Sequence, residues 1–222
     1  MSAPSGAVAP RVLWAPDAES IGRSRLWAFT QQLAPLGVEI GPGDYASLHA
    51  WSVSQPAEFW SAVQRFLELP VTAPPTMILD HVAVGDCRWF PGATFNYAEF
   101  IMRGAMRGDA SRTAILNVSE SDDVEEITWP ELTLMVAAAA QGLRSLGVKR
   151  GDVVAAILPN RHEAIVGLLA AASIGAIWTI CPPEFGTKAV VDRFDQLAPR
   201  VLITSMTHSY GGRRFEDLER LR

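Results

Sequence analysis

The chain has little lysine, little cysteine and few histidines, and each scarcity narrows the range of functions. Only two of its 19 basic residues are lysines, Lys149 and Lys188, although many phosphate-handling enzymes depend on a lysine. The two cysteines, Cys87 and Cys181, form no CxxC motif. That absence excludes a disulfide scaffold and a zinc ribbon, and it is typical of a reducing compartment. The four histidines lack a partner at metal-ligand spacing, so we expect surface or packing roles and no metal site.

The common catalytic signatures are also absent. There is no GxxxxGK[ST] phosphate loop and no GxGxxG motif. Residues 171–175 (AASIG) have the spacing of a GxSxG elbow but lack its first glycine and lie at the end of a predicted helix. The acidic run Glu120–Glu126 is expected to be a solvated hairpin tip rather than a cation site. No catalytic residue is therefore predicted within this sequence.

Charge and hydropathy exclude two further classes. The net charge of −5 argues against a nucleic-acid binder, whose binding face is normally basic. Residues 1–15 are expected to be a flexible tail, because the first ten have no charge and no apolar core typical of a signal peptide. The uncharged run 164–181 is long enough to suggest a membrane span. Its small residues and Gly175 favour a buried helix, a turn and a buried strand instead, so we expect no membrane span and a cytoplasmic protein.

What is present is enough apolar sequence for a real core, since 49% of 222 residues are hydrophobic. The first hundred residues predict a helical and irregular region, rich in Trp. The helices expected there are Ser20–Leu33, one or two turns over Tyr45–Trp51, a helix after Ser54 as its cap, and Asn96–Met106. Four prolines predict irregular structure between the last two of these helices.

From residue 111 the pattern becomes regular. Thr113–Val118 and the segment 127–129 predict a hairpin, and Thr128 with Glu131 forms a capping box that starts an Ala-rich helix. Apolar runs at 152–158, 176–180 and 200–204 then alternate with helices that we expect to be capped by Asn160 and Thr187. Apolar strands that alternate with helices of this length predict a parallel sheet covered on both faces.

Three turns are candidate anion sites. The turns at 159–160 and 181–187 precede helices whose free N–H groups and dipole would face a ligand. The segment Tyr210–Arg214 places two glycines beside two arginines, whose guanidinium groups can bind a phosphate. A plain connection remains the alternative for each turn.

Several whole phrases of the chain resemble the acetoacetyl-CoA synthetases, AMP-forming acyl-CoA ligases related to acetyl-CoA synthetase. The phrases in chain order are DYASLHAWSV (44–53), FW (59–60), WFPGA (89–93), NYAE (96–99), ITWPEL (127–132), LGV (146–148) with GD (151–152), LPN (158–160), ASIGA (172–176), PEFG (183–186) and RF (193–194). Their order and spacing match from about residue 11 to the end. The phrase at 89–93 favours the acetoacetate branch.

The resemblance implies an α/β fold in two parts. Residues 16–108 resemble the N-terminal region of acetyl-CoA synthetases, and residues 109–222 resemble the incomplete beginning of a three-layer, parallel-sheet AMP-binding domain. It also implies a ligase that uses ATP, CoA and Mg²⁺. In that reaction acetoacetate attacks the α-phosphate of ATP, pyrophosphate leaves, and the CoA thiol then displaces AMP. The implied partners are these small molecules.

The resemblance assigns binding residues but no catalytic residue. After the strand at 200–204, acetyl-CoA synthetases contact CoA through arginines; Arg213 falls on one such position and Tyr210 replaces another. The family's phosphate loop, Mg²⁺-orienting acid, ribose-binding Asp and adenylation lysine have no counterpart in residues 1–222. Pro183-Glu184 stands where the family more usually has Pro-Asp, and Glu184 keeps the carboxylate at the second position.

We therefore interpret the chain as the N-terminal part of an acetoacetate–CoA ligase that is inactive by itself. The alternatives are a non-catalytic product that binds CoA or is completed by another chain, and a fragment of an acetyl- or other short-chain acyl-CoA synthetase. An unpaired edge of the sheet further predicts self-association.

Overall fold

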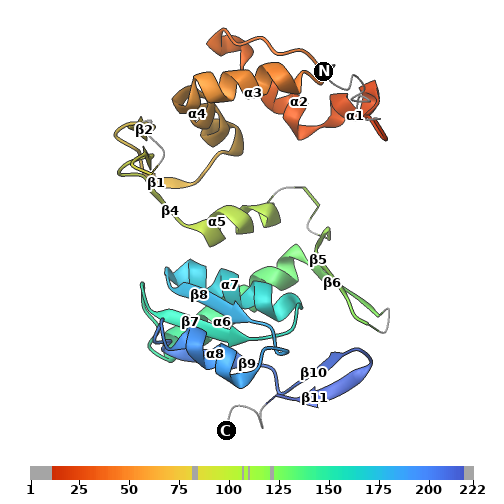
Figure 1. Cartoon of the computed structure of the whole chain (residues 1–222), viewed down its shortest axis with the longest axis vertical. Coiled ribbons are helices and arrows are strands. Elements are labelled where there is room, and N and C mark those ends of the chain that lie inside the picture. The colour runs from red at the N-terminus through yellow and green to blue at the C-terminus, as the bar shows by residue number, and fades with distance from the viewer. Residues whose placement is uncertain (1–11, 82–84, 107, 110, 121–122, 218–222) are drawn as a thin grey trace, which may run out of the picture. The chain divides into compact units, whose positions relative to one another are not determined.

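A computed structural model describes residues 12–81, 85–106, 108–109, 111–120 and 123–217. The chain divides into two compact units, residues 1–94 and 95–222 (Figure 1). The expected tail lies outside the described residues up to residue 11, and residues 12–15 are exposed. The domain boundary expected at residues 108 and 109 stays a prediction.

The first unit begins with a broken helix where one continuous helix was predicted. Helix α1 (Ala18–Arg23) and helix α2 (Arg25–Gln31) are separated by Ser24, whose backbone is extended. The Ser24 hydroxyl accepts a hydrogen bond from the Trp27 N–H at 3.0 Å, so it caps α2 instead of continuing α1. The prediction of one helix over 20–33 was wrong. The apolar residues keep a helical spacing on both sides of Ser24, so their pattern does not show that the serine side chain interrupts the helix.

Two further helices complete this unit. Helix α3 (Tyr45–Ser54) is longer than the one or two turns expected, and the Asp44 side chain caps it through the Ser47 N–H. Helix α4 (Pro56–Leu67) begins with proline, whose missing N–H costs nothing in the first turn of a helix. The expected cap, Ser54, instead donates to the Trp51 carbonyl, and Gln55 is the N-cap without a side-chain bond.

An aromatic core holds these helices together. Phe29 contacts the rings of Phe59 and Phe66 edge to face, with centroids 6.0 and 5.3 Å apart. Leu33 and Trp51 are buried in the same cluster. The irregular segment that follows contains only short strand pairs within its described residues. These are β1 (Val71–Ala73) with β4 (Thr94–Phe95), and β2 (Leu79–Asp80) with β3 (Arg88–Trp89).

The second unit begins with helix α5 (Tyr97–Met102) and a short 3₁₀ helix (Arg103–Met106). The strands β5 (Thr113–Val118) and β6 (Val124–Thr128) form the predicted antiparallel hairpin. Its tip is shorter than expected, because Glu125 and Glu126 belong to β6; residues 121–122 lie outside the described residues. Helix α6 (Trp129–Ser145) starts with the capping box of Thr128 and Glu131, which confirms that prediction.

The three apolar runs form a parallel sheet of order β8-β7-β9. Its strands are β7 (Val153–Ile157), β8 (Ile177–Cys181) and β9 (Val201–Thr204). The crossover helices are α7 (His162–Ile174) and α8 (Thr187–Phe194). Their N-caps are Arg161 and Gly186, without side-chain cap bonds, so the expected caps Asn160 and Thr187 were each wrong by one residue.

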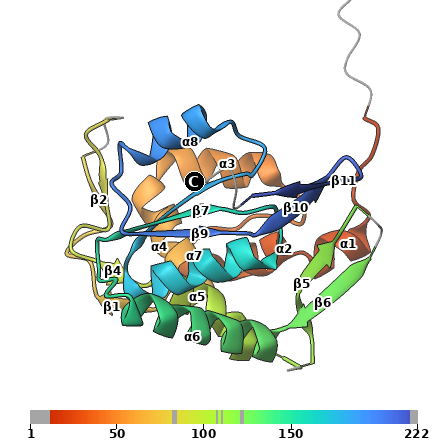
Figure 2. The same ribbon diagram turned by 90° about the horizontal axis from the view of Figure 1, so that it is seen from below.

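The sheet lies in the middle of three layers, as the alternation predicts. Figure 2 shows β7 and β9 between α8 on one side and α7 with α6 on the other. Val154 packs toward α6 and α7, whereas its neighbours Ala155 and Ile157 pack with Val190 and Phe194 of α8. The run 164–181 is a helix, a turn at Gly175 and a strand, as expected, and among the described residues no helix is long and apolar enough to cross a membrane.

A second hairpin follows the sheet. Strands β10 (Thr207–Tyr210) and β11 (Arg213–Glu216) pair antiparallel around the two-residue turn Gly211-Gly212. Both glycines have positive φ, 59° and 70°, which is the conformation that a two-residue hairpin turn of this hand requires.

Candidate functional site

The two predicted binding residues lie together at the tip of the second hairpin. Tyr210 is directly opposite Arg213 in the strand register. Directly paired residues share a face of an antiparallel ribbon, so the phenol and the guanidinium project from the same side. The Arg213 guanidinium lies 5.7 Å from the centre of the Phe215 ring, and both site side chains are exposed. Arg214 belongs to the opposite face and lies 3.7 Å from Glu216.

The base of the hairpin is a buried polar cluster that sequence reasoning missed. Asp217, only 3% exposed, accepts a hydrogen bond from the Ser205 hydroxyl at 2.5 Å. Its other oxygen lies 2.6 Å from Nδ1 of His208, which is also buried. The His208 ring stacks on Phe215 with centroids 5.1 Å apart, which agrees with the surface or packing role expected of each histidine. Nothing in the spacing of 205, 208 and 217 would have indicated the cluster.

The tip of the hairpin is held by a residue from the other hairpin. The Gly211 and Gly212 N–H groups donate to the two carboxylate oxygens of Glu120, at 2.9 and 3.1 Å. Hydrogen bonds from Gly212 and Gly211 lower the pKa of the Glu120 carboxyl, because they stabilise its charged form. Figures 1 and 2 show the β10–β11 hairpin beside the β5–β6 hairpin.

A groove of about 360 Å³ lies near the base of the hairpin, at the carboxyl ends of the parallel strands. Ile157 ends β7, Thr204 ends β9 and Pro183 follows β8, and all three line it together with Asp217. Ligands of open α/β sheets bind at this end of the strands. One predicted anion turn, 181–187, contributes to the groove.

The other predicted anion turn has different surroundings. At the start of α7, the Arg161 side chain lies 3.7 Å from Glu125 and 3.6 Å from Glu163. His162 Nδ1 lies 3.4 Å from Glu125, although without hydrogen-bond geometry. Two carboxylates thus already face this helix N-terminus, and an anion site there stays a prediction.

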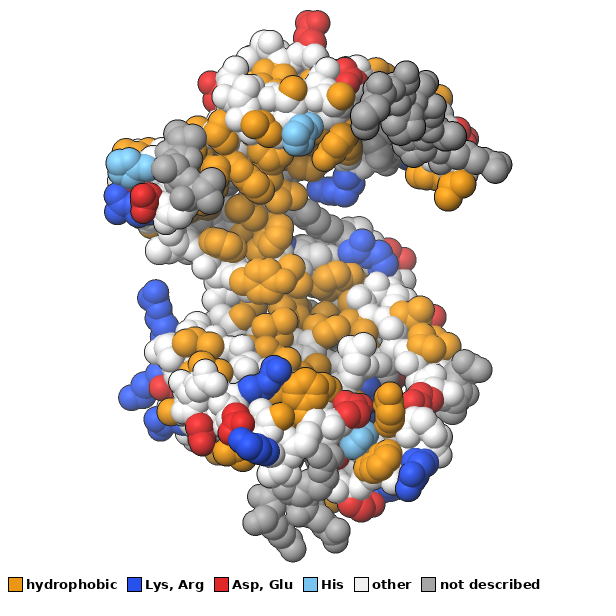
Figure 3. All heavy atoms as spheres, in the orientation of Figure 1, with side chains coloured by type: hydrophobic (Ala, Val, Ile, Leu, Met, Phe, Trp, Pro, Cys, Tyr) orange, Lys and Arg blue, Asp and Glu red, His pale blue; other side chains and the backbone are white. Residues whose placement is uncertain are grey.

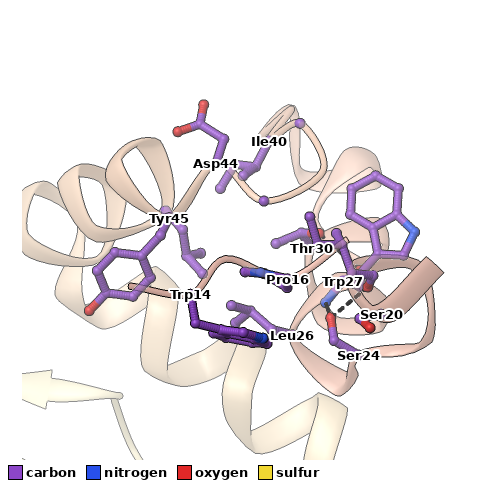
Figure 4. A pocket seen from close by; sticks show the side chains of 14 residues that line it. Trp14, Pro16, Ser20, Ser24, Leu26, Trp27, Thr30, Ile40, Asp44 and Tyr45 are labelled. Carbon is purple, nitrogen blue, oxygen red and sulfur yellow. Dashed lines mark hydrogen bonds between the residues drawn. The ribbon is translucent and has the colours of Figure 1, made fainter. Parts of the chain in front are cut away.

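The first unit contains an apolar hollow of about 410 Å³ between its helices (Figure 4). Trp14, Leu26, Trp27 and Tyr45 are among the side chains drawn around it, and none of its fourteen lining residues is basic. Its one carboxylate, on Asp44, accepts from the Ser47 N–H. The hollow therefore offers no cationic side chain that would bind a phosphate.

Charge is mixed around the second unit. Figure 3 shows basic and acidic side chains interspersed over its visible face. Both cysteines are free thiols, and Cys181 is buried in the core beneath α8. Within the described ranges, no three His, Cys, Asp or Glu side chains come together to hold a metal ion, so nothing there assigns a ligand to Mg²⁺.

Comparison with known families defines the class. Residues 103–221 match the AMP-binding enzyme family, and residues 45–100 match the acetyl-coenzyme A synthetase N-terminus. The first match covers more than half of the chain, so the chain belongs to the AMP-binding enzyme family. The resemblance found in the sequence is thereby confirmed at the level of the family.

Individual relatives narrow the class further. The chain is 38% identical over 208 residues to acetoacetyl-coenzyme A synthetase of Rhizobium meliloti, covering 93% of this chain and 31% of the relative. It is 32% identical over 207 residues to malonamoyl-CoA synthetase of Penicillium aethiopicum, covering 91% and 28%. The solved acetoacetyl-CoA synthetase from Streptomyces lividans matches with a TM-score of 0.87 and 40% identity, over 96% of this chain and 33% of that one. The chain thus spans about a third of these proteins and has the fold of an N-terminal part.

Proposed function

We propose that this chain is the N-terminal part of an acetoacetate–CoA ligase. The observation that carries the proposal is the match to the Streptomyces lividans enzyme over 96% of the chain at 40% identity. In the proposed reaction, a carboxylate oxygen of acetoacetate attacks the α-phosphorus of ATP and pyrophosphate leaves. The CoA sulfur then attacks the acyl carbon and AMP leaves. Such chemistry depends mainly on positioning and on neutralising charge at phosphorus.

A ligase for another short acid is the second candidate. The malonamoyl-CoA synthetase of Penicillium aethiopicum aligns over nearly the same part of the chain, at 32% identity. This portion therefore supports the ligase class more strongly than it supports one acyl group. A cytoplasmic location is part of the proposal, supported by the two free thiols.

Within that ligase, we assign CoA binding to the β10–β11 hairpin. The exposed Arg213 guanidinium can donate two parallel hydrogen bonds to a phosphate such as the 3′-phosphate of CoA. The Tyr210 hydroxyl, on the same face, can donate a third. The two glycines of the turn have no side chains of their own, and the Glu120 carboxylate binds their N–H groups.

Calorimetry of the 222-residue chain tests this assignment. CoA should bind more tightly than dephospho-CoA, which lacks the 3′-phosphate, and Arg213→Ala should abolish the difference. Arg214→Ala is the matched control, because the neighbouring arginine lies on the other face of the hairpin and should leave the difference unchanged. Equal affinity of the unaltered chain for both ligands, or no binding at millimolar CoA, would refute the site.

Activity of the chain by itself is a separate question. We propose that it does not form acetoacetyl-CoA, since no residue of 1–222 matches the family's phosphate loop or adenylation lysine. Exchange of labelled pyrophosphate into ATP in the presence of acetoacetate should stay at background. Clear exchange that scales with the chain's concentration would show that the 222 residues suffice for adenylation.

A further inference from the structure

The turn of the β10–β11 hairpin is an anion-binding concavity built from backbone. Gly211 and Gly212 form the two-residue turn, and successive backbone N–H groups exposed in a turn can point toward the same anion. Concavities of this kind bind phosphates and carboxylates in many proteins. Here both N–H groups donate to one carboxylate, that of Glu120, each to a different oxygen. The turn is thus filled by an anion from the chain itself.

The contact joins two hairpins that are distant in sequence. Glu120 follows β5 and lies 91 residues before Gly211. Its carboxylate is exposed, so it faces the same solvent as an incoming ligand. While Glu120 holds both N–H groups, a phosphate must use side-chain donors instead. Arg213 and Tyr210, which flank the turn on one face, are such donors.

The hairpin is consequently held at both ends. At the base, the buried Asp217 accepts from Ser205 and lies against His208. At the tip, Glu120 holds the two glycine N–H groups. Between these points, Tyr210 and Arg213 lie opposite each other. A short ribbon fixed at one end only would let the guanidinium sample many positions, and ordering it on binding would reduce affinity.

We propose that Glu120 is a positioning residue for the CoA-binding hairpin. Its carboxylate acts as an internal anion that fixes the turn through the N–H groups of Gly211 and Gly212. The Arg213 guanidinium then remains available to donate hydrogen bonds to the 3′-phosphate. This inference rests on the proposed function, because it assumes that the hairpin binds CoA. It goes beyond that function by assigning a role to a residue that never touches the ligand.

Variants at Glu120 test the proposal on the 222-residue chain. Glu120→Ala removes both acceptors, and Glu120→Gln leaves only one. We expect Glu120→Ala to weaken CoA binding by about tenfold, the order expected when a site loses preorganisation. Binding of dephospho-CoA should not change, because it lacks the phosphate that Arg213 meets. Glu126→Gln is the matched control: it removes the same charge from the same hairpin, where Glu126 accepts from the Thr113 hydroxyl.

The amide resonances of Gly211 and Gly212 provide a second, spectroscopic readout. Both should move in Glu120→Gln and stay in place in Glu126→Gln. Adding CoA to the unaltered chain should leave them nearly unchanged, because Glu120 keeps the N–H groups. If CoA moves them as much as Glu120→Gln does, or if Glu120→Ala binds CoA more tightly, then Glu120 is a competitor of the ligand and the positioning role is wrong.

The two proposals can fail separately. Equal binding of CoA and dephospho-CoA by the unaltered chain would overturn the proposed site and, with it, the phosphate role of Glu120. In that case, glycine resonances that still respond to Glu120→Gln would support the contact alone. If the Gly211 and Gly212 resonances do not shift in Glu120→Gln, the positioning role is wrong even if CoA binds through Arg213.

Discussion

Gly167 of α7 lies directly against the indole of Trp178 on β8: a Cβ at Gly167 would come within 2.4 Å of Cη2 of that ring. The glycine therefore sets how closely the helix approaches the sheet. Trp178 packs with the core beneath α6 and α7, so its ring has little room to withdraw.

Replacing Gly167 by alanine should destabilise the second unit despite alanine's higher helix propensity. Forcing an extra methyl group into a packed core costs about 1–3 kcal/mol. Gly142→Ala in α6 is the matched control, because no atom lies within 4 Å of the added Cβ. There the propensity gain should stabilise the chain by about 0.5–1 kcal/mol. Urea unfolding of both variants checks the opposite signs, and equal shifts would contradict the close packing.

Asn96 connects α5 to α7 through its side chain. Replacing it should therefore cost more free energy of unfolding than replacing an ordinary helix cap. Its side-chain oxygen accepts from the Glu99 N–H at 3.1 Å, and its amide donates to the Ala172 carbonyl at 3.0 Å. We expect Asn96→Ala to cost about 1–3 kcal/mol in thermal or urea unfolding. Asn117→Ala, which loses only an exposed bond to Glu125, should cost less than about 0.5 kcal/mol. Equal losses would show that the bond to α7 contributes nothing.

The buried cluster at the hairpin base should be sensitive to loss of its carboxylate. Asp217→Ala leaves the partly buried Ser205 hydroxyl and the buried His208 ring without their shared acceptor. We expect a loss of about 2–4 kcal/mol in the free energy of unfolding. Asp192→Ala removes an exposed acid that pairs with Lys188 and should change it by less than about 0.5 kcal/mol. A small effect at Asp217 would mean that water replaces the lost acceptor.

The contact of Glu120 with the turn should be lost in acid. A carboxyl whose pKa is lowered by a contact favours that contact while it is ionised. The contact is therefore complete above the ordinary pKa of 4.5 and is lost as the pH falls through the lowered value. The Gly211 and Gly212 amide resonances should be constant near neutrality and shift together in acid, and Glu120→Gln should abolish that titration. A shift centred near neutral pH would contradict the assignment.

Outer strands of the parallel sheet expose large apolar side chains, so the chain should associate. Ile177 on β8 is 51% exposed, and Leu202 on β9 is 45% exposed. Exposed edges and apolar faces promote association. Sizing chromatography should give oligomers that increase with concentration, and Leu202→Lys should reduce them. Leu134→Lys on α6 adds the same charge away from the sheet and should not. A sharp monomeric peak with cooperative unfolding would refute this prediction.

The features that could be predicted from the sequence are those set by residues close together in the chain. Thr128 and Glu131 lie three residues apart, so their capping box could be recognised directly. The parallel strands could also be recognised, because a strand that is buried on both faces is a continuous apolar run rather than an alternation of apolar and polar residues. Ser24 was missed because apolar spacing carries no information about a hydroxyl that competes for backbone bonds.

Long-range relations at the site could not be predicted. Two adjacent glycines indicated a tight turn, but only the register places Arg213, and not Arg214, on the face of Tyr210. Glu120 stands in an acidic run, where composition indicates solvation and nothing more. The two N–H groups that donate to its carboxylate lie 91 and 92 residues further along the chain, and no local pattern links them to Glu120.

That separation has a kinetic consequence for the second unit. A contact that closes a long loop forms late in folding, because the chain must first lose the entropy of bringing its ends together. The hairpin can form from its own turn, whereas its attachment to Glu120 must wait for the intervening sheet and helices. Interactions absent from the transition state act mainly on the unfolding rate. The contact of Glu120 should therefore slow the opening of the hairpin without speeding its formation.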